Sequence, residues 1–132
     1  MNPDLSILAE VFGRYADIQA VYLFGSHAND TAHQGSDLDL AVVPRSRTAR
    51  ENKLEILTDL ARIGFTDVDL VFLDTTDMVL KYEAIRHNRL VYQAADFDRG
   101  TLFSNVVRQY LDLKPYLDVQ RQAYRRRILS GQ

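Results

Sequence analysis

The chain has 132 residues, of which 46% are hydrophobic and 26% are charged, and these proportions are typical of one folded domain with a single substantial core. Six glycines and three prolines argue against a low-complexity or collagen-like segment, and the absence of cysteine excludes disulfide bonds, thiolate metal sites and a catalytic thiol. The N-terminus has no cationic segment leading into an apolar run, and no apolar run is long enough to span a membrane, so we expect an unexported cytoplasmic protein.

The formal net charge of -2 is unevenly distributed along the chain. Residues 1–120 hold all 18 acidic residues and 12 of the 16 basic ones, and the last twelve residues hold four arginines and no acid. An acidic body argues against general nucleic-acid binding. The arginines of the tail form either a solvated helix end, which we favour, or a cationic patch for phosphates or an acidic partner: Arg121, Arg125, Arg126 and Arg127.

The N-terminal half predicts two helices and two strands. A helix over 3–16 is predicted by apolar residues at helical spacing, namely Leu5, Leu8, Val11, Phe12 and Tyr15. Runs rich in β-branched and aromatic residues predict strands over 18–24 and 37–43, the first of which ends in a turn at Gly25-Ser26. Helical spacing returns over 48–63, with an expected inner face of Leu54, Leu57, Leu60 and Ala61.

The C-terminal half continues the alternation of elements. It predicts a strand over 68–73, a helix over 76–86 capped by Thr76, and a short strand over 89–93. From residue 97 onward apolar residues again recur at helical spacing, and Pro115 inside this stretch predicts two helices or one kinked helix. Its tyrosines and leucines are expected to be core contacts, with an exposed partner surface as the alternative.

The order α-β-β-α-β-α-β-α is typical of an α/β protein with a small mixed β-sheet flanked by helices. We expect one domain over 1–132, with a core over about 1–95 and a C-terminal helical segment over about 96–132.

Two acidic residues interrupt the second strand in an otherwise apolar stretch. Alternate residues of a strand point to the same face, so the carboxylates of Asp37 and Asp39 are expected to lie close together. Like charges at this separation are unfavourable unless they share a cation. Oxygen ligands without nearby histidine or cysteine favour Mg²⁺ or Mn²⁺, and Mg²⁺ commonly completes its shell with substrate phosphate oxygens. The pair therefore indicates a nucleotide site.

Two further features fit this interpretation. Asp69 lies in another apolar strand and would complete a three-carboxylate site for two metal ions if the two strands are neighbours. Gly25 and Ser26 follow a strand, where a glycine lets the backbone approach a phosphate and a hydroxyl with free N–H groups can hold it.

These residues carry a family resemblance. Phe24-Gly25-Ser26, ten intervening residues and Asp37-Leu38-Asp39 resemble the signature of the DNA polymerase β nucleotidyltransferase superfamily, and Val68-Asp69-Leu70-Val71 resembles its third-carboxylate strand. In length the chain is most similar to the minimal nucleotidyltransferases (MNT), which include the antitoxins of HEPN/MNT toxin-antitoxin pairs. The stretch after Ser26 departs from many relatives, because it reads His27-Ala28-Asn29-Asp30 where they have a small residue, a base and a glycine.

The resemblance implies a polymerase β-type nucleotidyltransferase fold and a Mg-dependent enzyme that transfers AMP from ATP to a hydroxyl. In the MNT antitoxins the acceptor is a tyrosine of a cognate HEPN ribonuclease toxin, which would be the partner here. Asp37, Asp39 and Asp69 would be catalytic and hold two Mg²⁺ ions, with Mn²⁺ as the alternative, and Gly25 and Ser26 would bind the nucleotide. The other hypotheses are a non-catalytic antitoxin that acts by complex formation and an enzyme that modifies a small molecule such as an antibiotic.

Overall fold

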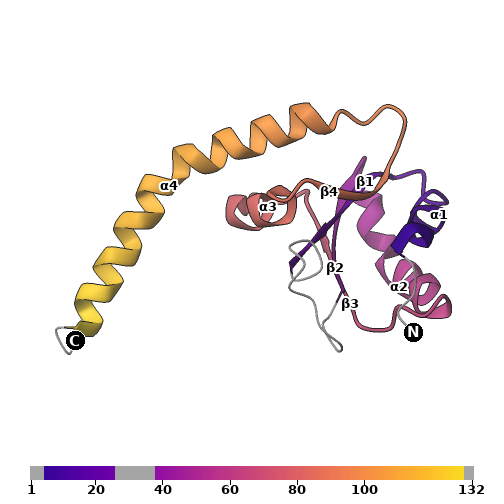
Figure 1. Ribbon diagram of the computed structural model, residues 1–132, viewed down its shortest axis with the longest axis horizontal. Helices are drawn as coiled ribbons and strands as arrows, with labels where there is room; N and C mark the ends of the chain where they lie inside the picture. The colour runs from indigo at the N-terminus through magenta and orange to yellow at the C-terminus, as the bar shows by residue number, and fades with distance from the viewer. Residues whose placement is uncertain (1–4, 26–37, 130–132) are drawn as a thin grey trace.

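The structure, a computed structural model, describes residues 5–25 and 38–129. Its elements follow the predicted alternation of helices and strands (Figure 1). In chain order they are the 3-10 helix η1 (Leu5–Ile7), α1 (Leu8–Phe12), β1 (Ile18–Phe24), β2 (Leu38–Pro44), the 3-10 helix η3 (Arg47–Asn52), α2 (Lys53–Arg62), β3 (Val68–Phe72), α3 (Met78–Ile85), β4 (Arg89–Gln93) and α4 (Arg99–Leu129). Within the described ranges, no helix has the length and apolar character that crossing a membrane requires.

The four strands form one mixed sheet in the order β3-β2-β1-β4, which confirms the predicted fold class. The pair β1–β2 is antiparallel, as is β1–β4, whereas β3 runs parallel to β2. The parallel pair requires a crossover, which η3 and α2 supply between β2 and β3. The central strands β1 and β2 are almost entirely buried, as strands with both faces covered should be.

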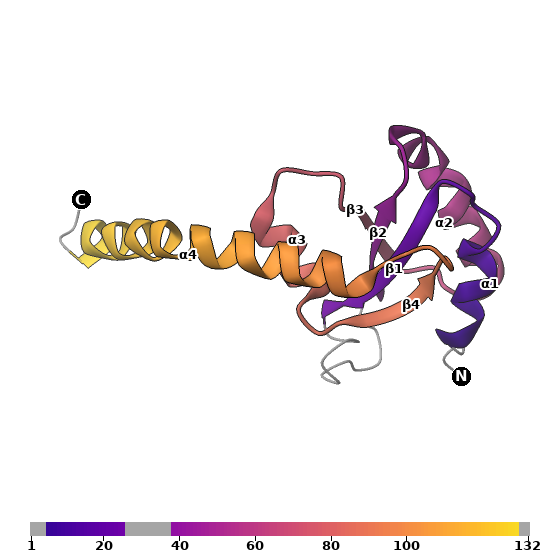
Figure 2. The same cartoon turned by 90° about the horizontal axis from the view of Figure 1, so that it is seen from above.

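Each face of the sheet has its own hydrophobic core. One face packs against α1 and α2, with Phe12, Ile56 and Leu60 fully buried beneath it. The other face packs against α3 and the first part of α4, where Ile85 and Val106 are buried. The two layers lie on opposite sides of the sheet in both views (Figures 1 and 2). Alternating side chains of β1 and β2 therefore serve two different cores.

The first helix is shorter than the predicted range 3–16. It begins as a 3-10 turn and its α-helical part ends at Phe12. Bonds of the i to i+3 type close the following turn, from Arg14 N to Val11 O and from Tyr15 N to Phe12 O. Tyr15 is buried although it lies outside the helix. Because it continues the apolar spacing of the helix, the predicted range was too long.

The inner face predicted for the second helix is partly wrong. Leu54 is 77% exposed, and the fully buried residues are Ile56 and Leu60. Leu57 and Ile63 pack against the same core, so 56, 57, 60 and 63 form a helical stripe as regular as the predicted one. Periodicity alone does not choose between two such stripes, because the choice depends on where the sheet lies.

The other helix boundaries also differ in detail. Asp77, rather than Thr76, caps α3, since its carboxylate accepts a hydrogen bond from Leu80 N at 3.1 Å. The C-terminal segment is one continuous helix with Pro115 inside it. It changes direction near its middle and extends away from the sheet (Figure 1). Of the two predicted forms, the single bent helix is the one that the structure contains.

Candidate active site

Two of the predicted carboxylates meet on neighbouring strands. β2 and β3 pair in parallel with Asp39 opposite Asp69, so the two side chains leave the same face of the sheet. Neighbouring strands are about 4.8 Å apart, which is close enough for two carboxylates to share a cation. The sequence predicted this neighbourhood only on the condition that the two strands are adjacent, and the register meets that condition.

The carboxylates lie at the margin of the core beneath α3 and α4. Ala41, two residues after Asp39 and therefore on the same face, is fully buried in that core. Asp39 is half-buried and Asp69 is exposed. The site thus has one side against packed apolar residues and the other open to solvent, so a charged ligand can reach the carboxylates from solvent.

Gly25 closes the site from the end of β1. Its φ of +70° lies in the left-handed region, which other residues rarely adopt. A Cβ placed on Gly25 would collide with Oδ2 of Asp39 and lie 3.1 Å from its Cγ. The backbone of the turn therefore runs directly against the Asp39 carboxylate, and only glycine leaves that carboxylate in place.

The other predicted site residues, Ser26 and Asp37, lie outside the described residues, as does the departing stretch His27-Ala28-Asn29-Asp30. Within 5–25 and 38–129, no three acidic, histidine or cysteine side chains gather as metal ligands would. The described part of the chain supplies two of the three predicted carboxylates.

The acids that flank Asp69 have different surroundings. Asp74 follows the far end of β3 and forms an ion pair with Arg50, with 2.6 Å between Nη2 and Oδ1. This guanidinium lowers the pKa of the Asp74 carboxyl. Asp67 lies just before β3, where its carbonyl accepts a hydrogen bond from Leu38 N at 2.8 Å. Asp74 is therefore a structural partner of Arg50, and Asp67 serves as a nearby comparison for Asp69.

Sequence reasoning missed the turn between α3 and β4. Arg89 at the start of β4 pairs with Leu23 near the end of β1, so this turn comes to the same end of the sheet as Gly25. Arg86 and His87 are exposed in the turn, which Asn88 completes with a φ of 54°. No sequence signal reveals this placement, because it depends on β4 pairing with β1 rather than with β3.

The mixed sheet, the two facing carboxylates and the glycine turn suit an enzyme that acts on phosphate groups with the help of metal ions. Comparison with known families agrees, because the model described as "Polymerase beta, Nucleotidyltransferase" matches residues 7–97. The chain belongs to this nucleotidyltransferase family, and its substrate is accordingly a nucleotide.

The chain is also similar to individual proteins of known sequence or structure. The chain is 29% identical over 106 residues to the protein adenylyltransferase MntA of Shewanella oneidensis, a match that covers 80% of this chain and 73% of that protein. A chain from the crystal structure of a toxin-antitoxin with AMP-PNP has a TM-score of 0.70 at 23% identity, covering 96% of this chain and 98% of the other. A chain from the complex of a tri-AMPylated Shewanella oneidensis HEPN toxin with MNT antitoxin has a TM-score of 0.61 at 20% identity, covering 96% and 99%. The two structural likenesses establish the shared fold.

Proposed function

We propose that this chain is an antitoxin that transfers AMP from ATP to a tyrosine hydroxyl of a cognate HEPN ribonuclease toxin. The observation that carries this proposal is the register that sets Asp39 opposite Asp69, with the Gly25 turn against Asp39. The relative named as a protein adenylyltransferase and the fold neighbour from a complex with a tri-AMPylated toxin support the choice of AMP and of a protein acceptor.

The donor set fits a hard divalent cation. Asp39 and Asp69 offer oxygen ligands side by side, and the nearby Gly25 turn keeps side-chain atoms out of the space next to Asp39. In this proposal Asp37, Asp39 and Asp69 hold two Mg²⁺ ions, and Mn²⁺ is the alternative. Bound at these carboxylates, the ions would supply positive charge that stabilises the negative charge of the phosphates.

The chain's own residues then have separate roles. Gly25 and Ser26 hold the β- and γ-phosphates through backbone N–H groups and the hydroxyl. Asp69, the more exposed carboxylate, accepts the proton of the tyrosine hydroxyl. The tyrosine oxygen forms a bond to the α-phosphorus while the bond from that phosphorus to the bridging oxygen of the β-phosphate breaks, and pyrophosphate leaves. The product is a tyrosine that carries AMP.

The experiment follows label from α-labelled ATP to the purified toxin. We expect wild-type protein to label the toxin, Asp39→Asn and Asp69→Asn to lose at least about a hundredfold in rate, and Asp67→Asn to retain the wild-type rate. Asp67→Asn is a matched control, because it removes the same charge two residues before Asp69. Asp69→Asn should still bind both ATP and toxin.

The non-catalytic antitoxin makes the opposite prediction. In that case wild-type protein transfers no label and neutralises the toxin as well as Asp69→Asn does. Equal labelling by Asp69→Asn and wild type would instead remove Asp69 from the reaction.

A further inference from the structure

The second half of α4 has an apolar surface with nothing of the described chain beneath it. The stacked rings of Tyr82 and Tyr110, with centroids 3.9 Å apart, join α3 to the middle of α4. Beyond them the helix extends away from the body in both views (Figures 1 and 2). Four large apolar side chains of this half are 57–70% exposed, namely Leu111, Tyr116, Val119 and Tyr124.

The stripe that docks α4 on the body continues into this free half. Val106 is buried against the sheet and Tyr110 packs on α3. Leu113, Leu117 and Tyr124 extend the same helical face at spacings of three, four and seven residues. An apolar stripe that continues past the end of its own core is typical of a surface that a second molecule covers.

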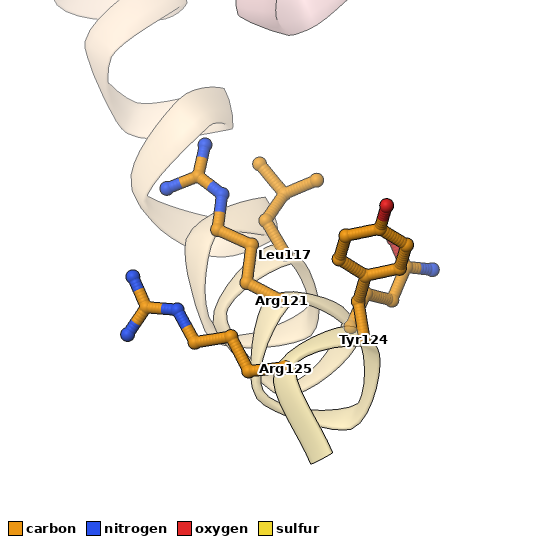
Figure 3. Close-up of a pocket in the computed structure, with 5 residues that line it drawn as sticks. Leu117, Arg121, Tyr124 and Arg125 are labelled. Carbon is orange, nitrogen blue, oxygen red and sulfur yellow. The ribbon is translucent and has the colours of Figure 1, made fainter. Parts of the chain in front are cut away.

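Two arginines, Arg121 and Arg125, border the continued stripe on one side. After Asp118 the described helix carries four arginines and no acid. A groove of about 310 Å³ lies along Leu117, Gln120, Arg121, Tyr124 and Arg125. Arg121 and Arg125 extend to the same side of the helix, and Leu117 lies between them and Tyr124 (Figure 3). The surface thus combines apolar contacts with a row of positive charge.

This surface is separate from the nucleotidyltransferase core. The family match ends at residue 97, before α4 begins at Arg99. The fold neighbours, in contrast, cover 95–97% of this chain, which includes most of α4. The helix therefore belongs to the shared fold without belonging to the part that defines nucleotidyl transfer.

We propose that the second half of α4, residues 111–127, is the docking surface for the acceptor protein, and that it binds an acidic face of that protein which also presents apolar side chains. The proposal rests on the proposed function for the identity of the partner as the toxin. Docking on α4 would hold the acceptor beside the sheet while its tyrosine reaches Asp69.

A second copy of the chain fits this surface less well. In a parallel pair of α4 helices, the arginines would face the same arginines. In an antiparallel pair centred on Leu117, they would face residues 107–113, which hold only Arg108 and Asp112 as charged residues. Neither arrangement places more than one acidic residue opposite Arg121 and Arg125.

RNA is also a poorer match. A surface for RNA alone would not need the apolar stripe of Leu113, Leu117 and Tyr124, and the body that carries the helix has a net negative charge. A protein with acidic and apolar positions satisfies both parts of the surface.

The test measures the affinity of the full chain for the purified toxin. Arg121→Glu/Arg125→Glu should weaken binding about tenfold or more at low salt, with a smaller difference at high salt. Leu117→Ser/Tyr124→Ser should weaken it to a similar degree at both salt concentrations. The controls are Lys53→Glu/Arg62→Glu, which also reverses two positive charges, and Leu54→Ser, which also replaces an exposed leucine; both change exposed positions of α2 and should bind as wild type. ATP affinity should be equal in all variants.

The outcomes separate this proposal from the proposed function. Wild-type toxin affinity in both α4 variants overturns the docking surface and leaves AMP transfer standing. A self-association of the chain that the α4 variants abolish, with toxin affinity unchanged, assigns the surface to a second copy and also overturns the proposal. The proposal is also overturned if the α4 variants lose affinity for an RNA oligonucleotide while their affinity for the toxin is unchanged. A wild-type chain that neither binds nor labels the toxin overturns both proposals.

Discussion

The contact between Gly25 and Asp39 makes the candidate site sensitive to a single methyl group. Gly25→Ala adds a Cβ that collides with the Asp39 carboxylate and forces alanine into a left-handed conformation. We expect a loss of about 1–3 kcal/mol in the free energy of unfolding and weaker ATP binding. Gly100→Ala is the control, since its Cβ would meet its nearest atom at 3.6 Å, and alanine favours a helix. Equal denaturation midpoints for the two variants would contradict the assigned geometry.

Two buried tyrosines predict opposite effects of the same substitution. The Tyr22 hydroxyl is buried without a hydrogen-bond partner among the described residues, so Tyr22→Phe should leave the free energy of unfolding unchanged or raise it by up to about 1 kcal/mol. The Tyr15 hydroxyl donates a hydrogen bond to Oδ2 of Asp59 at 2.6 Å, so Tyr15→Phe should lower the free energy of unfolding by about 1–2 kcal/mol. Urea unfolding of both variants checks the pair, and a loss in Tyr22→Phe as large as that in Tyr15→Phe would show that the Tyr22 hydroxyl has a partner.

Tyr15 also predicts how stability depends on alkaline pH. Burial, and then the hydrogen bond to Asp59, raise the pKa of Tyr15 above its ordinary value of 10.0. The folded state therefore favours the neutral phenol, and its contribution to stability is complete below pH 10 and is lost as the pH rises beyond that value. We expect the free energy of unfolding to fall above pH 10 more steeply in wild type than in Tyr15→Phe, measured by urea unfolding across that range. Parallel curves would remove Tyr15 as the cause.

At the scale of elements, the sequence predicts the positions of strands far better than it predicts which strands pair. All four strands lie within one residue of their predicted ends, because β-branched runs bounded by turns are local signals. The predicted inner face of α2 is partly wrong, because the buried stripe depends on which side the sheet lies, and the predicted range 3–16 is too long, because Tyr15 is buried from the turn after α1. For the site, the acids and Gly25 are visible in the sequence. The sequence does not show that Asp39 lies opposite Asp69 or that Gly25 lies against Asp39. These contacts require the parallel register of β2 and β3 and the left-handed turn.

Pro115 gives a prediction about the helix that contains it. A proline inside a helix removes one backbone hydrogen bond and crowds the preceding turn, and here the helix changes direction near its middle (Figure 1). Pro115→Ala should slow amide hydrogen exchange in the turns around residue 115 by about tenfold or more, while the midpoint of global unfolding changes little because this half lies outside both cores. Unchanged exchange would mean that another feature bends α4.

At the scale of the whole molecule, the two faces of the sheet have different tasks. The face under α1 and α2 is closed by apolar packing, whereas the face under α3 and α4 carries the carboxylates at one end and the helix that extends from the body. Charge is divided along the chain instead, because residues 1–120 have a net negative charge and the end of α4 carries four arginines and no acid. This arrangement suits a catalyst whose acceptor is another protein, because the reaction site and the proposed docking helix lie on the same side of the sheet.

The intact mass of the toxin tests the central claim most directly. The toxin is purified after coexpression with the wild-type chain, with Asp39→Asn or with Asp67→Asn, and its mass is measured. We predict that wild type and Asp67→Asn add a whole number of AMP groups to the toxin, and that Asp39→Asn adds none. A toxin that keeps its unmodified mass beside the wild-type chain, yet has lost its ribonuclease activity, would contradict AMP transfer through the Asp39 and Asp69 site.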